Sequence, residues 1–160
     1  MINLRNVSIE FIGFGIMGEL MCENVLKKGY LVCFYDINPK KIEKLAKIGG
    51  IPCRNLKEIA NNCNFIIIMV PTSNDVSEVI EELLQQLKPN TIIIDMSTIS
   101  PGVSIELAEK IKQAGNNILD APVVKSKSAA ISGDLGIYMV DDPEVFEEIK
   151  PIYKMSMPFQ

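Results

Sequence analysis

The chain has 160 residues, 48% of them hydrophobic and 22% charged, which is enough apolar material for one globular domain with a substantial core. Its net charge of −4, without a basic run, argues against a nucleic-acid partner, and no apolar stretch approaches the ~20 residues that a membrane span needs. The four cysteines form no C-x-x-C pair and histidine is absent, so we expect reduced thiols, no metal site and a cytoplasmic protein.

Apolar runs and helical periodicities alternate along the whole chain. In chain order, the expected elements are a strand over 7–12, a helix over 17–28, a strand over 31–35, a helix over 39–47, a strand over 51–53, a helix from 55, a strand over 65–70, a helix over 74–87, a strand over 91–95, a helix over 101–114, strands over 117–119 and 137–140, and a helix over 142–153. Asn38 and Ser100 are the expected N-caps of helices that begin with proline. The alternation predicts an α/β fold with a Rossmann-type, doubly wound, mostly parallel sheet in a single domain over 1–160.

The turn after the first expected strand carries the most informative motif. Gly13, Gly15 and Gly18 fit the pattern G-x-G-x-x-G between a strand and a helix. Gly13 would allow a sharp turn, Gly15 would let a pyrophosphate approach the backbone, and Gly18 would let the helix pack closely on the strand. Asp36, at the end of the second strand, would accept hydrogen bonds from the adenosine ribose. The segment therefore predicts a dinucleotide site with the phosphates at the helix N-terminus.

Small polar residues and prolines also gather at the ends of later strands. These ends are Val70 to Thr72, Asp95 to Thr98, and Asp120 onward. Ligands of doubly wound sheets bind beyond the carboxyl ends of the strands, so the ends together predict one binding rim. Taken singly, Thr72, Ser97 and Thr98 are more typical of turns and helix starts than of ligand contacts.

Four segments, in this order, resemble the β-hydroxyacid dehydrogenase family, which includes 3-hydroxyisobutyrate dehydrogenase and tartronate semialdehyde reductase. The segments are 11–18 with Asn24 and Gly29, 69–72, 95–101, and 120–123 with its continuation to Val140. The resemblance implies an NAD(P)-dependent oxidoreductase that moves a hydride between nicotinamide and a short 3-hydroxy acid or semialdehyde. It also implies that Pro71 and Thr72 line the nicotinamide half of the cofactor and that Thr98 lies beside the nicotinamide ribose.

The motif and the resemblance together define the expected cofactor site. The expected cofactor-binding residues are Gly13, Phe14, Gly15, Ile16, Met17, Gly18, Asp36, Val70, Pro71, Thr72 and Thr98. An acid after the second strand favours NAD, because it would repel a 2′-phosphate, although NADP remains possible. Lys40 and Lys41 would soften that repulsion if they faced the site, but as helix-start residues we expect them to be solvated.

The expected substrate loop departs from the family pattern. The family has Ser-Gly-Gly after D-A-P-V, and its hydroxyl and amides hold the substrate carboxylate. This chain has Val124, Lys125 and Ser126 there, and a valine side chain donates no hydrogen bond. Lys125 would restore a positive charge for the carboxylate of a hydroxy acid, with a solvated loop lysine as the alternative.

The family continues beyond the position of Gln160 with a helical domain that carries the lysine acting as acid/base. No catalytic residue is therefore assigned within 1–160, and we expect this chain alone to bind cofactor but to lack turnover. Without that domain, we expect the apolar tail over 152–159 to cause self-association through non-native surfaces, and we expect the protein to be a homo-oligomer. Two interpretations remain open: the cofactor domain of a longer dehydrogenase, or a free-standing dinucleotide-binding module with a sensory or scaffolding role.

Overall fold

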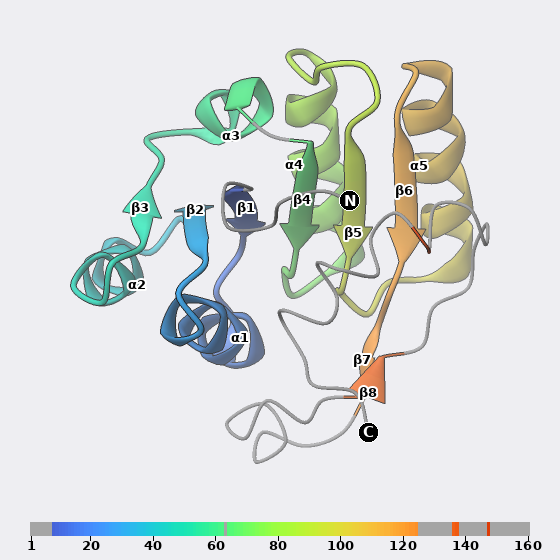
Figure 1. Ribbon diagram of the computed structural model, residues 1–160. Coiled ribbons are helices and arrows are strands. Elements are labelled where there is room, and N and C mark those ends of the chain that lie inside the picture. The colour runs from blue at the N-terminus through green and yellow to red at the C-terminus, as the bar shows by residue number, and fades with distance from the viewer. Residues whose placement is uncertain (1–7, 63, 125–135, 138–146, 148–160) are drawn as a thin grey trace.

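The computed structural model describes residues 8–62, 64–124, 136–137 and 147. Six strands form one parallel sheet in the order β3-β2-β1-β4-β5-β6 (Figure 1). The strands are β1 (Ser8–Ile12), β2 (Leu31–Tyr35), β3 (Ile51–Pro52), β4 (Phe65–Ile68), β5 (Ile92–Asp95) and β6 (Asn117–Asp120), and the helices are α1 (Ile16–Lys27), α2 (Pro39–Ala46), α3 (Leu56–Asn62), α4 (Ser73–Leu84) and α5 (Pro101–Gln113). This strand order confirms the expected Rossmann-type doubly wound fold.

Helices cover both faces of the sheet, so the molecule has two apolar cores. On one face, α1 and α2 pack on β1 and β2, with Val25 and Leu45 fully buried. On the other face, α3, α4 and α5 bury a second cluster that includes Ile80 and Ile111. Strand β4 supplies Ile67 to the first core, and it supplies Ile66 and Ile68 to the second. A strand covered on both faces needs apolar residues at every position, which explains the uninterrupted run in the sequence.

The order of the strands reverses between β1 and β4. The chain runs from β1 outward through β2 to β3, and then returns through α3 to β4 on the other side of β1. The connection after β1 leads to α1 on one face, whereas the connection after β4 leads to α4 on the other. The two connections diverge, so a crevice opens at the carboxyl ends of these strands.

Both expected N-cap residues begin their helices, but only one of them caps through its side chain. The Asn38 side chain accepts a hydrogen bond from the Lys40 N–H at 3.1 Å, which confirms it as the N-cap of α2. Ser100 is the N-cap of α5 as expected, although its side chain makes no capping hydrogen bond. Its N–H instead donates to the Ser73 hydroxyl at 3.0 Å.

Two strands differ from expectation. The expected strand over 65–70 ends at Ile68, because the Val70 N–H donates to the Ser97 hydroxyl at 3.0 Å and Pro71 has no N–H. A separate antiparallel pair, β7 (Val123–Val124) with β8 (Gly136–Ile137), was not foreseen. The strand expected over 137–140 overlaps the described residues only at its first position. The helix expected over 142–153 lies outside them except for Glu147, which is helical.

Candidate cofactor site

The glycine turn after β1 depends on glycine at two of its three positions. Gly13 has a φ of +91°, and a Cβ there would lie 2.3 Å from the Met69 carbonyl oxygen. A Cβ on Gly18 would lie 2.7 Å from the Gly13 carbonyl oxygen, so α1 approaches β1 as closely as the motif implies. A Cβ on Gly15 would meet no heavy atom of the described residues within 4 Å. Folding therefore requires Gly13 and Gly18, whereas the space above Gly15 is open to a ligand.

The N-terminus of α1 presents its N–H groups beside that open space. Gly15 is the N-cap and offers no side chain for capping. The Phe14 ring is buried between Phe11 and Phe34, at centroid distances of 5.9 and 5.2 Å, so only its backbone faces the turn. Met17 likewise packs on the α1–α2 core. The backbone, not these side chains, is therefore what the turn can offer to an anion.

Asp36 connects the end of β2 to the glycine turn. Its side chain is mostly buried, one carboxylate oxygen accepts the Phe14 N–H at 2.5 Å, and the other accepts the Asn38 N–H at 2.7 Å. A carboxylate has about four lone-pair sites, so both oxygens retain acceptor capacity toward a ligand. Asp36 thus has a structural role that the motif did not reveal, in addition to the expected one.

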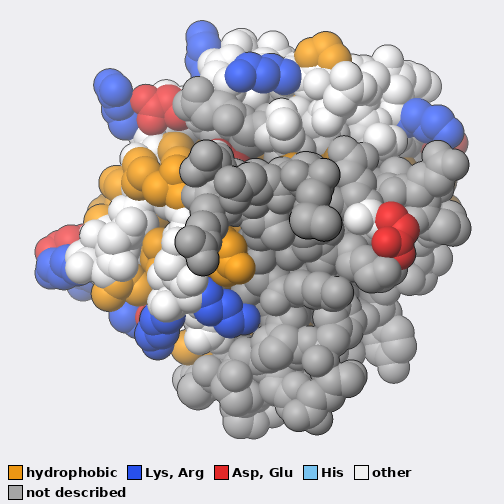
Figure 2. Space-filling model, viewed as in Figure 1, with side chains coloured by type: hydrophobic (Ala, Val, Ile, Leu, Met, Phe, Trp, Pro, Cys, Tyr) orange, Lys and Arg blue, Asp and Glu red, His pale blue; other side chains and the backbone are white. Residues whose placement is uncertain are grey.

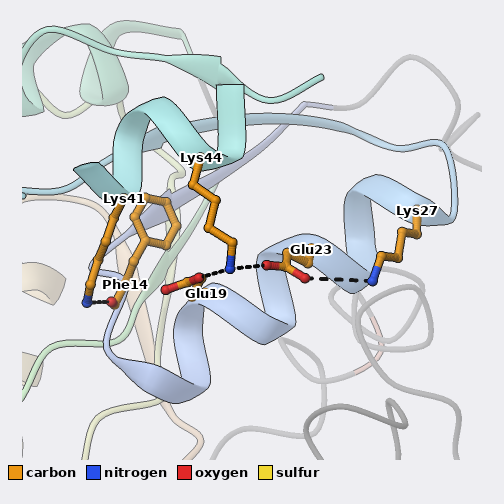
Figure 3. Close-up of polar contacts among 6 residues, drawn as sticks. All are labelled: Phe14, Glu19, Glu23, Lys27, Lys41 and Lys44. Carbon is orange, nitrogen blue, oxygen red and sulfur yellow. Dashed lines mark hydrogen bonds and ion pairs between the residues drawn. The ribbon is translucent and has the colours of Figure 1, made fainter. Parts of the chain in front are cut away.

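Two lysines of α2 reach the turn and α1 (Figure 3). The Lys41 ammonium donates to the Phe14 carbonyl oxygen, and the residue is only partly exposed. Our expectation that Lys41 is solvated was therefore wrong, whereas Lys40 is exposed as expected. One turn further on, Lys44 pairs with both Glu19 and Glu23 of α1. These contacts join α2 to the helix whose N-terminus forms the site.

A cavity of about 410 Å³ opens at this point of the fold. Its described lining residues are Ile12, Gly13, Phe14, Gly15, Tyr35, Asp36, Ile37, Asn38, Lys41, Leu56, Met69, Val70, Pro71, Asp75, Glu78, Val79 and Glu82. They come from the carboxyl ends of β1, β2 and β4 together with α2, α3 and α4, so the cavity occupies the crevice at the β1–β4 reversal. The geometry thus brings together six of the expected residues: Gly13, Phe14, Gly15, Asp36, Val70 and Pro71.

The other expected cofactor residues lie outside this lining. Thr72 is the N-cap of α4 in a capping box, with its hydroxyl bonded to Asp75, and Thr98 is exposed after β5. Ile16, Met17 and Gly18 form the first turn of α1. Val124 is in β7, while Lys125 and Ser126 lie outside the described residues.

Sequence reasoning missed the contribution of α4 to the cavity. Asp75, Glu78, Val79 and Glu82 all line it. Their spacing, i, i+3, i+4 and i+7, places them on one face of a helix, and this spacing was the available signal.

Figure 2 shows hydrophobic side chains reaching the surface on the side of α2 and β3. Among the exposed large hydrophobics is Ile37, 89% exposed at the cavity.

Beyond the cavity, β5 and β6 end in two carboxylates. Asp95 and Asp120 are register partners on these adjacent strands. Asp95 is 2% exposed, and its Oδ1 accepts the Ser97 N–H at 2.9 Å. Burial raises the pKa of Asp95 to about 6, with a smaller contribution from the charge of Asp120. The pattern Asp-x-Ser is a known turn signal, but only the fold shows that this acid is buried.

Within the described ranges, no group of three or more His, Cys, Asp or Glu side chains is placed to hold a metal ion. No helix in the described part of the chain is long and apolar enough to span a membrane.

The fold and this site define a Rossmann-type dinucleotide-binding domain. Residues 8–157 match the family described as the NAD binding domain of 6-phosphogluconate dehydrogenase, and the chain belongs to that family. It is 36% identical over 130 residues to mitochondrial 3-hydroxyisobutyrate dehydrogenase of Mus musculus, covering 79% of this chain and 39% of the mouse protein. It is 30% identical over 151 residues to 2-(hydroxymethyl)glutarate dehydrogenase of Eubacterium barkeri, covering 92% and 50%.

Solved structures agree with the sequence relatives. The 3-hydroxyisobutyrate dehydrogenase of Mycobacterium tuberculosis, solved with L-serine, superposes with a TM-score of 0.90 at 27% identity, covering 94% of this chain and 52% of that one. The chain therefore spans about half the length of the relatives it matches or less. These comparisons confirm the resemblance: this is an NAD-binding domain of the β-hydroxyacid dehydrogenase type.

Proposed function

We propose that this chain is the cofactor-binding half of an NAD-dependent dehydrogenase acting on a short hydroxy acid. The observation that carries the proposal is the open space over Gly15, next to the N-terminus of α1 and at the mouth of the cavity. The Mus musculus and Eubacterium barkeri relatives are both named as dehydrogenases of hydroxy acids, which supports the substrate class.

The residues of the site fit a dinucleotide, which supplies the hydride acceptor when bound. The first-turn N–H groups of α1 would bind the pyrophosphate, and Gly15 leaves room for it. Asp36 would accept hydrogen bonds from the adenosine ribose, and the exposed side chain of Ile37 would cover the adenine. Pro71, Thr72 and Thr98 would bound the nicotinamide half at the ends of β4 and β5.

We propose NAD rather than NADP as the cofactor. The described residues lining the cavity include four carboxylates, namely Asp36, Asp75, Glu78 and Glu82, and one lysine, Lys41. The Lys41 ammonium is already bonded to the Phe14 carbonyl. An additional 2′-phosphate would therefore enter a field of negative charge, and its repulsion would lower affinity.

The acid/base is assigned outside the described residues, and so are the remaining substrate contacts apart from Val124 of β7. In the family, a lysine on a following helical domain is the acid/base, so we propose a longer, two-domain protein in which residues 1–160 hold the cofactor. Val124, Lys125 and Ser126 would meet the substrate carboxylate. We further propose that the enzyme is a cytoplasmic homo-oligomer.

Calorimetry of the chain with NAD+, NADH and NADP+ tests the cofactor, and we expect NAD(H) to bind more tightly than NADP+. Substrate-dependent NADH formation by the natural gene product, assayed with short 3-hydroxy acids, tests the activity. NAD(H) binding without any turnover by that product would favour the alternative, a sensory or scaffolding module, which the altered 124–126 segment motivates. Absence of NAD(H) binding would refute both.

A further inference from the structure

Two hydrogen bonds join the loop after β4 to the loop after β5. The Val70 N–H donates to the Ser97 hydroxyl at 3.0 Å, and the Ser100 N–H donates to the Ser73 hydroxyl at 3.0 Å. These loops carry the residues expected around the nicotinamide, including Thr98. Two serine hydroxyls therefore set the relative position of the two sides of the nicotinamide site.

The buried carboxyl of Asp95 lies beneath this junction. Its Oδ1 accepts the Ser97 N–H at 2.9 Å, and its Oδ2 is buried with no hydrogen-bond partner among the described residues. Both the N–H and the hydroxyl of Ser97 favour the charged form of Asp95, while burial and the charge of Asp120 oppose it. Asp95 therefore acts on the same serine that holds Val70.

Among the described residues, few charged groups surround Asp95. On β6 it faces Asp120, whose carboxylate lies 3.4 Å from the Ser104 hydroxyl of α5. On β4 its register partner is the apolar Ile68, and the first turn of α5 carries no acidic residue. Of the described residues, Asp120 is the one whose charge shifts the Asp95 pKa.

We propose that Asp95 is a positioning residue of the cofactor site, whose charged form holds Ser97 and, through the Ser97 hydroxyl, Val70 in the geometry that binds cofactor. The inference rests on the proposed cofactor-binding function. A charged carboxylate is a stronger acceptor than a neutral one, so protonation weakens the hold on Ser97. Protonation also places an O–H donor at a buried position, where the described residues provide no partner for Oδ2, and the junction must adjust.

The amino-acid composition allows the titration of Asp95 to be distinguished from that of other groups. Burial raises the pKa of Asp95 to about 6, close to neutrality. The chain contains no histidine, which would otherwise titrate in the same range. Burial also raises the pKa of Cys22 to about 12 and of Cys53 to about 11, far from this range. A step in cofactor affinity near pH 6 would therefore point to Asp95.

The test is calorimetric titration of the full chain with NAD+ from pH 5 to pH 8 at constant ionic strength. We expect the wild-type Kd to rise at least about fivefold toward pH 5, the lower end of typical coupling between sites, with a midpoint near 6. Asp95→Asn should bind at pH 8 as weakly as the wild type at pH 5 and show no step. Asp120→Asn should keep the step but lower its midpoint, because it removes the charge that raises the Asp95 pKa.

Two serine variants separate positioning from a general structural effect. Ser97→Ala should weaken binding at pH 8 and reduce the step, with Ser97→Thr restoring both. Ser73→Ala, which removes the other inter-loop hydrogen bond, is the matched control and should retain the step. A pH step that persists in Asp95→Asn, or a wild-type Kd that is constant from pH 5 to 8, would overturn the proposal.

Amide NMR of the wild-type chain without cofactor provides a second measurement that does not depend on binding or on the folding of variants. The Val70 and Ser97 amide signals should shift together with a midpoint near pH 6. If NAD+ binds but these signals do not move, the positioning inference fails while the proposed function stands. If NAD+ does not bind at any pH, the proposed function fails, and a shift of these signals then shows only that the junction titrates.

Discussion

Replacing Gly15 with alanine should impair cofactor binding while leaving the fold almost unchanged. Gly15 has φ −56° and ψ 178°, an extended backbone that alanine adopts, and its Cβ would meet no heavy atom of the described residues within 4 Å. Alanine is a poorer N-cap than glycine, but it also restricts the unfolded chain, and the two effects oppose each other. We expect the free energy of unfolding to change by less than about 1 kcal/mol.

Binding should respond more strongly, because the new methyl group would occupy the space through which the pyrophosphate approaches. Losing one hydrogen bond to a charged group costs about 1.5–3 kcal/mol, so we expect the Kd for NAD+ to rise at least about tenfold. Calorimetry measures the Kd, and urea unfolding followed by circular dichroism measures the stability.

Gly18→Ala is the matched control, since its Cβ would lie 2.7 Å from the Gly13 carbonyl oxygen. It should lower the free energy of unfolding by about 1–3 kcal/mol, the usual effect of overpacking. The reasoning is refuted if Gly15→Ala binds NAD+ as tightly as the wild type, or if it loses as much stability as Gly18→Ala.

Three further predictions follow from the site. Asp36→Asn should reduce the preference for NAD+ over NADP+ by about tenfold, because it removes one charge beside the ribose; an unchanged ratio of calorimetric Kd values would contradict this. Lys44→Met, which loses the exposed contacts with Glu19 and Glu23, should lower stability by less than about 1 kcal/mol in thermal unfolding, and a larger loss would show that the pair matters more than its exposure suggests. The folded-state pKa of Asp95 is raised from 3.8 to about 6, so its contribution to stability is present below the unfolded pKa and is lost as pH rises through 6. Urea unfolding at pH 4 and pH 8 should therefore show the wild type losing up to about 3 kcal/mol relative to Asp95→Asn, and parallel changes in the two proteins would exclude this titration.

The course of the chain could be predicted well wherever local patterns and tertiary environment agree. The run over 65–68 is apolar throughout because β4 is covered on both faces, and Asn38 caps α2 because its side chain bonds within its own helix turn. Ser100 occupies its predicted N-cap position, but its side chain makes no capping hydrogen bond, and its N–H donates to a serine 27 positions earlier in the chain. A local sequence pattern predicts hydrogen bonds within one helix turn, whereas the bond between Ser100 and Ser73 joins segments far apart in the chain.

In the candidate site too, the residues with local roles could be predicted from the sequence, and those whose roles depend on tertiary packing could not. Gly18 could be assigned from spacing, since its Cβ would meet the Gly13 carbonyl oxygen of the same turn, whereas the clash of a Cβ on Gly13 with the Met69 carbonyl oxygen depends on β4 lying beside β1. Lys41 could not be assigned from spacing, because its contact with the Phe14 carbonyl depends on how α2 packs beside α1. The acidic face of α4 has a visible helical spacing, but nothing in that spacing says that it borders the cavity.

The sequence by itself determined that this chain is a dinucleotide-binding domain of the β-hydroxyacid dehydrogenase type, because G-x-G-x-x-G, Asp36 and each later family segment can be read locally and follow one another in the family's order. The tertiary structure alone decided which side chains surround the cavity and which acid is buried at the end of β5. Asp95 and Ser97 are an ordinary turn in the sequence, and they matter because β5 ends beside β4 and β6. The physical reason is that the burial of Asp95, its proximity to the charge of Asp120 and the hydrogen bonds between the two loops all depend on which strands are neighbours. The order of the strands is set only when the sheet has folded.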